Sequence, residues 1–384
     1  MRLALILSND WELFGNGSGD FHELQERPLE ILLDSVERFG AKLTLFAELG
    51  QQIWGARRAG AGCSNQRQIA EGWENSIRRA VVRGCDVQAH IHPQWFDATL
   101  DGQEWILGKH GWSFGELPPA MMADGLTQSK QYLERLLKPV NPTYECICFR
   151  AGAFYMQPAV NALRALRSAG FRADSSVVPG LREEQRFDYR KVPSDLIPWW
   201  LGDSLLSTDE RSRDLLELPL YTRPGWDSPL LRKLISPRLF FKMFWGLDIS
   251  ADDETCMIRR NCELMRRYPL TQRTFLKSPR LLHAMFRRVL ARTAIPLDYD
   301  QLPPALFVRF LSAAFKDHSK CKAEATIPIM AIGHSKGIVD GSNLERILEM
   351  VKREFGDRLC FWTVREAIDY WFSDLTQDVG KSKI

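Results

Sequence analysis

The chain has 384 residues, of which 45% are hydrophobic and 26% are charged, a composition typical of a globular protein. Its formal net charge of +3 is small for this length, which argues against a protein that binds nucleic acid through overall charge. The first apolar run, MRLALILSNDWE, is too short for a secretory signal, and no stretch approaches the roughly 20 apolar residues of a membrane span. We therefore expect a soluble, cytoplasmic protein without a transmembrane segment.

Short apolar runs alternate with amphipathic stretches along most of the chain. The first run, RLALILS, is predicted to be a buried strand, and a helix follows that begins near Pro28 and ends at Gly40. The predicted strands, in chain order, are 2–8, 41–48, 85–92, 145–149, 172–177, 215–221, 327–334 and 358–364. The predicted helices are 27–40, 73–84, 157–171, 342–356 and 363–371.

Nearly continuous apolar strands separated by helices are typical of a parallel sheet covered by helices. We therefore predict an α/β fold, either a barrel or an open sheet, that forms a single domain over 1–384. The alternation breaks between about 228 and 325, where basic, aromatic and helix-like sequence is predicted to form a helical insertion. We interpret this insertion as a cap over a cleft, and contact with a membrane surface is the alternative.

Most ends of the predicted strands carry an acid, a base or a residue type that binds metal ions. In parallel α/β folds, functional side chains gather at the carboxyl ends of the strands. The residues found there, in chain order, are Asp10, Glu12, His90, His92, Arg150, Asp174, Glu217 and His334. A surface without a site would not repeat this pattern so regularly, so these residues are candidates for one shared site.

The segment QAHIHPQW places two histidines, His90 and His92, one residue apart at the end of a predicted strand. Residues i and i+2 of a strand point to the same face, so both imidazoles would leave the same side. Two histidines with one or two carboxylates suit a divalent ion such as Zn²⁺ with an open position for water. The alternative is a solvated strand end or a pair of hydrogen-bonded imidazoles.

The other candidates also have a structural and a functional interpretation. Asp10 and Glu12 are either a charged turn or a pair in which one carboxylate binds metal and the other accepts a proton. Arg150 is either a surface cation or a fork that holds a carboxylate. His334, flanked by glycines in GHSKG, is either a capping or core histidine or a general acid that faces a cleft.

The order of these residues resembles that of the NodB-homology polysaccharide deacetylases, carbohydrate esterase family 4. The resemblance rests on an acidic pair after the first strand, a histidine pair near residue 90, an arginine after the next strand and a late apolar strand that ends in histidine. It covers roughly residues 3 to 225 and 325 to 372. The resemblance implies a distorted (β/α) barrel with fewer than eight units.

The resemblance also implies the ligands of the metal ion. Asp10 corresponds to the family's base and Glu12 to a metal ligand, and the opposite assignment is open. The family usually spaces its histidines H-x-x-x-H. Gln94 stands at that spacing here, so His90 and His92 are expected to bind the ion instead.

Further roles follow from the same resemblance. Arg150 corresponds to the arginine that orients the base, and His334 corresponds to the catalytic acid. Asp174, in ADSS, is similar to the aspartate of the family's fourth motif, and we expect it to contact the substrate. Trp95 is one of several tryptophans in loop-like segments, where exposed indoles would stack on sugar rings.

The implied reaction is metal-assisted hydrolysis of an amide. It would release the acetyl group of an N-acetylated sugar in a polysaccharide or a glycan precursor, lipid-linked glycans included, with Zn²⁺ as the first choice of ion. One alternative is another metallohydrolase, of phosphoesterase or amidohydrolase type, although such barrels commonly carry H-x-H after their first strand. A non-catalytic sugar-binding protein is the second alternative.

Overall fold

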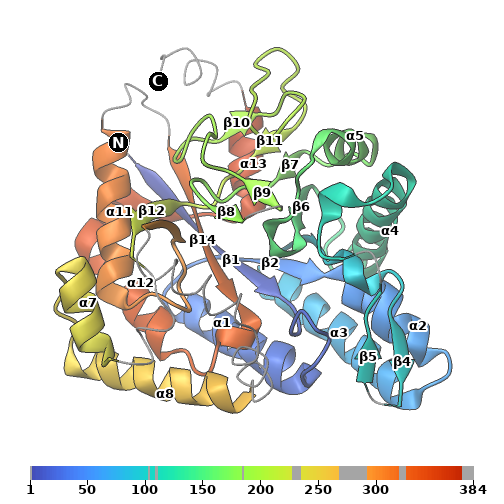
Figure 1. Cartoon of the computed structure of the whole chain (residues 1–384), viewed down its shortest axis with the longest axis horizontal. Helices are drawn as coiled ribbons and strands as arrows, with labels where there is room; N and C mark the ends of the chain where they lie inside the picture. Colours follow the sequence, from blue (N-terminus) through green and yellow to red (C-terminus); the bar gives the residue numbers. More distant parts are fainter. Residues whose placement is uncertain are drawn as a thin grey trace, which may run out of the picture.

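A parallel sheet forms the centre of the molecule, and helices cover it (Figure 1). The strands pair in the order β10-β11-β7-β6-β3-β2-β1-β14, with β15 also paired to β1. Every neighbouring pair is parallel except β10 with β11. The structure is a computed structural model that describes residues 2–102, 104–108, 111–183, 186–226, 235–267, 292–319 and 326–373.

The strands of the central sheet are β1 (Leu3–Trp11), β2 (Leu43–Glu48), β3 (Asp86–Ile91), β6 (Cys148–Ala151), β7 (Ala173–Asp174), β10 (Trp199–Trp200), β11 (Leu216–Glu217), β14 (Ile327–His334) and β15 (Leu359–Phe361). Three two-stranded pairs lie outside it: β4 (Thr99–Asp101) with β5 (Glu104–Ile106), β8 (Arg182–Glu183) with β9 (Phe187–Asp188), and β12 (Thr222–Gly225) with β13 (Thr293–Pro296). The α-helices are α1 (Arg27–Arg38), α2 (Arg57–Gly60), α3 (Ser64–Val82), α4 (Pro119–Leu137), α5 (Val160–Ser168), α7 (Pro237–Trp245), α8 (Ala251–Arg267), α11 (Pro304–His318), α12 (Ser342–Phe355) and α13 (Val364–Phe372).

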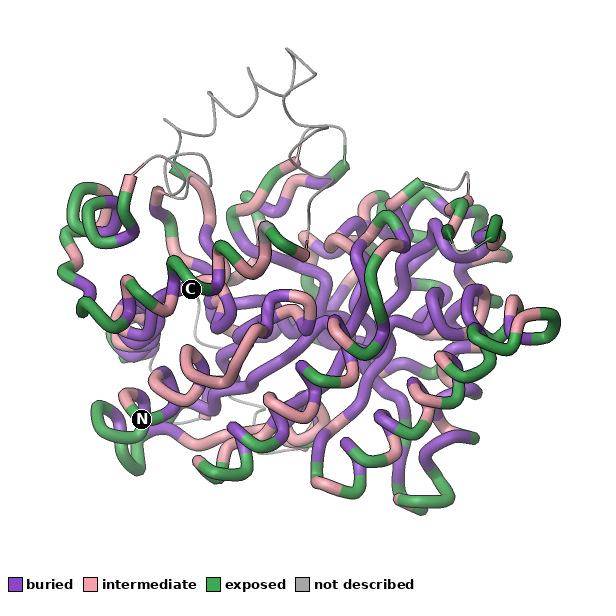
Figure 2. The backbone as a smooth tube through the Cα atoms, turned by 90° about the horizontal axis from the view of Figure 1, so that it is seen from below, coloured by how far each residue is buried: buried purple, intermediate pink, exposed green. Residues whose placement is uncertain are grey.

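Burial on both faces explains the apolar strands. All nine residues of β1 are buried, because the strand lies between β2 and β14 and is covered by helices. The helices are amphipathic instead: α1 buries Leu29, Leu32, Leu33 and Val36, which recur at the spacing of one helical face. Figure 2 shows the same contrast, with buried residues along the strands and exposed residues on the outer turns of the helices.

The predicted α/β class with a parallel sheet is confirmed, and the barrel is present only in part. The sheet curls into a half-barrel and does not close. Each predicted strand has a counterpart, although β7 and β11 contain only two residues each. No helix was predicted at α4, although its 19 residues form one of the two longest helices of the described chain.

The region 228–325 is not a purely helical insertion in its described part. It contains α7, α8 and α11, but also β13, which pairs with β12. Beyond β13, the backbone N–H of Ile332 in β14 donates to the carbonyl of Leu297, and Tyr299 donates back to Ile332. The region therefore contributes to the edge of the sheet beside β14. Residues 227–234, 268–291 and 320–325 lie outside the described residues, and the prediction of a single domain stays a prediction.

No helix in the described part of the chain is both long and apolar enough to cross a lipid bilayer.

Gly333 of β14 allows the segment after β13 to pack closely against the sheet. A Cβ atom at this position would lie 2.4 Å from two ring carbons of the fully buried Tyr299. We expect Gly333→Ala to lower the free energy of unfolding by about 1–3 kcal/mol, because an overpacked core must shift to relieve the clash. Urea unfolding followed by tryptophan fluorescence measures this change. Gly62→Ala is the matched control, since a Cβ there meets nothing within 4 Å, and equal stabilities of the two variants would contradict this packing.

Candidate metal centre

The candidate centre lies where five neighbouring strands end. In the register of the sheet, Asp10 of β1 pairs with His334 of β14, and Glu48 of β2 pairs with His90 of β3. His90 also pairs with Arg150 of β6. Because these strands run parallel, their carboxyl ends meet at one edge of the sheet. Candidates that are far apart in the sequence are therefore neighbours in the structure, as the strand-end pattern predicted.

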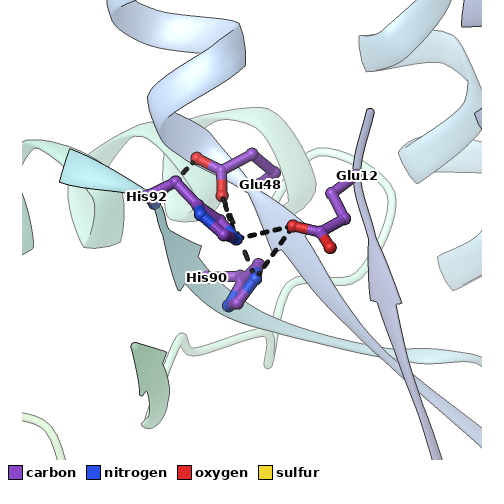
Figure 3. A group of neighbouring side chains, drawn as sticks. All are labelled: Glu12, Glu48, His90 and His92. Carbon is purple, nitrogen blue, oxygen red and sulfur yellow. Dashed lines mark hydrogen bonds and ion pairs between the residues drawn. The ribbon is translucent and has the colours of Figure 1, made fainter. Parts of the chain in front are cut away.

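Four buried side chains converge at this edge: Glu12, Glu48, His90 and His92 (Figure 3). One ligand-type atom of each lies within 4.8 Å of the others. Oε2 of Glu12 is 2.6 Å from Nε2 of His92 and 3.4 Å from Nε2 of His90. Oε2 of Glu48 lies 3.9 and 4.0 Å from the same two nitrogens. Two imidazole nitrogens and two carboxylate oxygens in one place are a donor set for a small divalent ion.

Glu48 is a member of this group that the sequence analysis missed. It is the last residue of the predicted strand 41–48, so the strand-end rule applied to this run would have found it. Its Oε1 accepts hydrogen bonds from the backbone N–H groups of Gly50, Gln51 and His92, at 2.7, 3.3 and 3.2 Å. These bonds fix the carboxylate and leave Oε2 facing the cluster.

Oε2 of Glu48 is buried without a hydrogen-bond partner among the described residues, and Nε2 of His90 and Nε2 of His92 are directed at the carboxylate oxygens of the same group. A buried polar atom normally has a partner, so a carboxylate oxygen without one, next to two imidazole nitrogens, indicates a point that suits a cation. Nδ1 of His90 lies 2.9 Å from the carbonyl oxygen of Arg150 and donates to it. When the ring gives up its second proton in exchange for a bound cation, the lone pair of His90 is therefore on Nε2, toward the cluster, as in a metal-binding histidine. The residues present therefore fit a divalent ion.

His92 is held in place from three sides. A Cβ at Gly152 would lie 2.5 Å from Cγ of the imidazole, so only glycine fits there. The ring of Trp112 meets the imidazole edge to face, with centroids 5.7 Å apart. Nε2 of Gln94 lies 3.2 Å from Nδ1 of His92 and donates to the carbonyl oxygen of Gly15 at 3.1 Å. Gln94 therefore supports the ring from behind and is not part of the group of four.

The cluster stabilises positive charge. Burial alone would raise the pKa of Glu12. The ammonium group of Lys336 lies 2.5 Å from Oε1 of Glu12, and together with the two histidines it outweighs burial and holds that pKa well below its usual value. Burial lowers the pKa of His90, but the carboxylates of Asp10, Glu12 and Glu48 raise it to about 9. Burial also raises the pKa of Glu48. A site that attracts a proton to a buried imidazole will also attract a cation.

Asp10 and Arg150 form a buried ion pair beside this group. Nη1 of Arg150 donates to Oδ1 of Asp10 at 2.6 Å, and the guanidinium is fully buried. The guanidinium also donates hydrogen bonds to Ser8 and Ser175. Its Cζ atom lies over the face of the Phe46 ring, 3.8 Å from the ring centroid. Oδ2 of Asp10 points the other way and lies 4.0 Å from Nε2 of His90. Burial raises the pKa of Asp10, but Arg150 and the nearby histidines lower it below its usual value.

In the strand order, His334 of β14 lies on the other side of Asp10 from His90. It is more exposed than either of these two residues. Its side chain is 27% exposed, and its Nε2 is 3.8 Å from Oδ2 of Asp10. Oδ2 of the buried Asp300 accepts the backbone N–H of His334 at 2.9 Å and lies 3.9 Å from Nδ1 of its ring. Asp298, Asp300 and His334 form the second group that could hold an ion among the described residues. The sequence analysis missed Asp300 because it lies inside the predicted helical insertion.

The two residues that the sequence suggested for substrate binding are buried. Trp95 is 2% exposed and packs edge to face against Trp105, with ring centroids 5.3 Å apart. Asp174 is fully buried, and its carboxylate accepts a hydrogen bond from the Ser176 hydroxyl at 2.8 Å. Other residues enclose both side chains in this structure, and their contact with a substrate stays a prediction. Trp112, half-buried beside His92, is the indole next to the metal ligands.

Known proteins resemble the chain only distantly. The sequence matches no protein-family model and no curated protein. A polysaccharide deacetylase from Mycobacterium smegmatis is similar in structure, with 12% identity, a TM-score of 0.44 and coverage of 96% of this chain and 90% of that one. Puue allantoinase gives 14% identity, a TM-score of 0.44 and coverage of 96% and 89%. A GH57 branching enzyme from Thermococcus kodakaraensis gives 10% identity, a TM-score of 0.49 and coverage of 97% and 72%. What the site does must therefore be derived from its own side chains.

We expect His90→Ala and Glu48→Gln each to weaken Zn²⁺ binding by about 100-fold or more, because each removes one of four donors. Competition with a chromophoric chelator measures the affinity. His22→Ala is the control, because His22 is exposed on the surface and pairs only with Glu26 in the described contacts. If Glu48→Gln bound Zn²⁺ as tightly as His22→Ala, Glu48 would not be a ligand.

Asp174 and Glu217 are a buried carboxyl pair on adjacent strands, in register with one another. Burial raises the pKa of Asp174 to about 6, and burial together with Asp174 raises the pKa of Glu217 well above its usual value. The native state therefore binds more protons than the unfolded chain, whose carboxyl groups have pKa values of about 3.9–4.3. The contribution of the pair to the free energy of unfolding therefore falls as the pH rises above about 4 and passes through the raised pKa values of the native state.

In Glu217→Gln, the side-chain amide can donate a hydrogen bond to Asp174 at any pH. The glutamate can donate only when its carboxyl group is protonated. We expect the variant to gain stability relative to the wild type as the pH rises from 5 to 8, in urea unfolding at each pH. Glu104→Gln, on the exposed strand β5, is the control and should follow the wild type. A stability difference between Glu217→Gln and wild type that does not change with pH would show that the pair is not protonated in the native state.

Proposed function

We propose that the protein is a metal-dependent hydrolase that removes the acetyl group from an N-acetylated sugar of a glycan. The observation that carries the proposal is the convergence of four buried side chains, Glu12, Glu48, His90 and His92, whose carboxylate oxygens and imidazole nitrogens surround one point. A base candidate, Asp10, and an acid candidate, His334, lie next to it. Hydrolysis of an amide needs these components together: a site that polarises the carbonyl, a group that takes a proton from water and a group that protonates the amine.

Glu12, Glu48, His90 and His92 would hold the ion. Zn²⁺ suits two imidazoles and two carboxylates, and its bond lengths of about 2.0–2.2 Å require only small movements of these side chains. A divalent ion held here would polarise the acetamide carbonyl and make a nearby water molecule more acidic.

Asp10 would act as the general base. Arg150 binds Oδ1 and leaves Oδ2 directed toward the metal ligands. The lowered pKa of Asp10 keeps the carboxylate ionised at neutral pH, so it can accept a proton from water. Because Arg150 is fully buried and fixed by four described hydrogen bonds, it would hold the orientation of Asp10 throughout the reaction.

His334 would act as the general acid. It is partly exposed, so its Nε2 can reach a leaving amine at the mouth of the site. Asp300 would position it, because the carboxylate holds the backbone N–H of His334 and faces Nδ1 of the ring. Asp10 and His334 are neighbours whose Oδ2 and Nε2 atoms lie 3.8 Å apart, so the first would take a proton from water and the second would protonate the amine at the same site.

A sugar substrate is supported by the order of the site residues in the sequence and by Trp112, whose half-buried indole next to His92 offers an apolar surface for a sugar ring. A lipid-linked glycan is one form that such a substrate would take.

We expect Asp10→Asn and His334→Ala to lower the rate of acetate release from N-acetylglucosamine oligosaccharides by about 10²–10⁴-fold, because each removes an acid or a base. Zn²⁺ bound at the group of four should remain at the wild-type level in both variants, since neither residue belongs to that group. Asp252→Asn, on the exposed first turn of α8, is the control and should keep full activity.

The same assay should include simple phosphoesters. Release of phosphate and not acetate by the metal-loaded wild type would replace amide hydrolysis with phosphoester hydrolysis. A metal-loaded protein that releases neither but binds the oligosaccharides would be a sugar-binding protein.

A further inference from the structure

A second group of acids faces the ring of His334. The chain after β13 runs beside β14, where Asp298 forms a parallel bridge with Ile332. Two residues further on, Oδ2 of Asp300 accepts the backbone N–H of His334 at 2.9 Å. One ligand-type atom each of Asp298, Asp300 and His334 lies within 4.8 Å of the others. The ring therefore has Asp10 beside its Nε2, at 3.8 Å, and Asp300 beside its Nδ1, at 3.9 Å.

The carboxylate of Asp300 has one buried oxygen that no donor reaches. Asp300 is 2% exposed, and its Oδ1 has no hydrogen-bond partner among the described residues. The neighbouring carboxylate, that of Asp298, uses Oδ1 to accept the backbone N–H groups of Asp300 and Gln301, at 2.9 and 3.0 Å. Two ionised carboxylates are acceptors only, so they can be joined only by a proton or a cation between them. Burial and the charge of Asp300 accordingly raise the pKa of Asp298 well above its usual value.

The protein's own cations do not pair with these two acids. Among the described ion pairs, Asp300 has the ring of His334 as its partner and Asp298 has none. Lys336, from the turn after β14, binds the carboxylate of one of the four metal ligands instead. Arg260 donates to a backbone carbonyl of the segment after β13 at 3.2 Å and adds one positive charge to the region. Two carboxylates outnumber this guanidinium, so the group still favours a cation.

The group is fixed in place and can be reached from solvent. A short 3-10 helix, Ser335–Gly337, follows β14, and a Cβ atom at Gly337 would lie 2.3 Å from Oδ2 of Asp300, so only glycine fits there. The side chain of His334 is 27% exposed, which leaves a path for an ion. Donor atoms around a tetrahedral Zn²⁺ ion lie about 3.4 Å apart, so the separation of 3.9 Å between Asp300 and His334 requires only a small movement.

We propose that Asp298, Asp300 and Nδ1 of His334 hold a second divalent cation, and that this cation inhibits the hydrolase. A ring that binds a cation at Nδ1 carries at most one proton, on Nε2, so it cannot form the imidazolium that would protonate the amine. The second cation site stands on the geometry of these three side chains. Its inhibitory effect rests on the proposed function, in which His334 is the general acid.

Equilibrium dialysis of the full chain against Zn²⁺ tests the second site. The wild type should bind a second ion at least about tenfold more weakly than the first, because this group offers three donors and the first group four. Asp298→Asn and His334→Ala should each bind one ion fewer than the wild type. The amide of Asp298→Asn keeps an acceptor for the backbone N–H groups and loses only the charge. Asp252→Asn, on the exposed first turn of α8, is the matched control and should bind as the wild type does.

Acetate release at rising Zn²⁺ concentration tests the inhibition. The rate of each protein is compared with its own rate at one equivalent of Zn²⁺. Excess Zn²⁺ should lower the rates of the wild type and of Asp252→Asn at least about tenfold, because the second ion would silence an acid worth about 10²–10⁴ in rate. The rate of Asp298→Asn should stay nearly constant over the same range.

Wild-type protein that binds a single ion at saturation would overturn the second site. So would Asp298→Asn and His334→Ala variants, shown to be folded by far-UV circular dichroism, that bind as many ions as Asp252→Asn, since the extra ion would then be an adventitious ion only. A second ion lost in both variants but without effect on the wild-type rate would overturn the inhibition. Wild-type protein that releases no acetate at any Zn²⁺ concentration would contradict the proposed function, while dialysis would still decide the second site.

Discussion

Arg150 is the residue on which the rest of the site depends. Its guanidinium binds Asp10, the proposed base, and its backbone carbonyl accepts Nδ1–H of His90, a proposed metal ligand. One residue at the end of β6 thus orients a proton acceptor and fixes a histidine tautomer. The guanidinium is fully buried, and removing one partner of a buried ion pair typically costs about 3–5 kcal/mol. The site and the stability of the sheet around it are therefore coupled through this side chain.

A second constraint is the concentration of negative charge at the carboxyl ends of the strands. Buried carboxylates are unfavourable unless they are paired or bind a cation. Lys336 satisfies one oxygen of Glu12, and backbone N–H groups satisfy one oxygen of Glu48. The other oxygen of each faces the two histidines. A divalent ion at this point would balance the two carboxylates and bind the Nε2 atoms of both histidines, which explains why two glutamates and two histidines occur together.

The α/β class and the proximity of most candidate residues could be predicted from the sequence because parallel strands bring their carboxyl ends to one edge. That rule predicts that Asp10, His90, Arg150 and His334 lie close together, and the register of the sheet shows that they are neighbours. It also applied to Glu48, which was overlooked because a glutamate at the end of the run LTLFAE resembles an ordinary polar strand end.

Other features depend on tertiary packing and have no local sequence signal. Asp300 reaches the site because the chain after β13 returns to the edge of β14. The burial of Trp95 is decided by Trp105 and the glycines Gly50 and Gly55, which pack against it. The open sheet, in place of the closed barrel, likewise depends on how β10 and β14 end the strand order. None of these contacts joins residues close enough in the sequence to form a pattern.

The most direct test of the account is an anomalous difference map from a crystal of the wild-type protein grown with Zn²⁺, with data collected on both sides of the zinc absorption edge. The account predicts one strong peak between Glu12, Glu48, His90 and His92, within bonding distance of both Nε2 atoms. A zinc peak elsewhere, with these four side chains unchanged and without density between them, would contradict the metal centre and the hydrolase mechanism built on it.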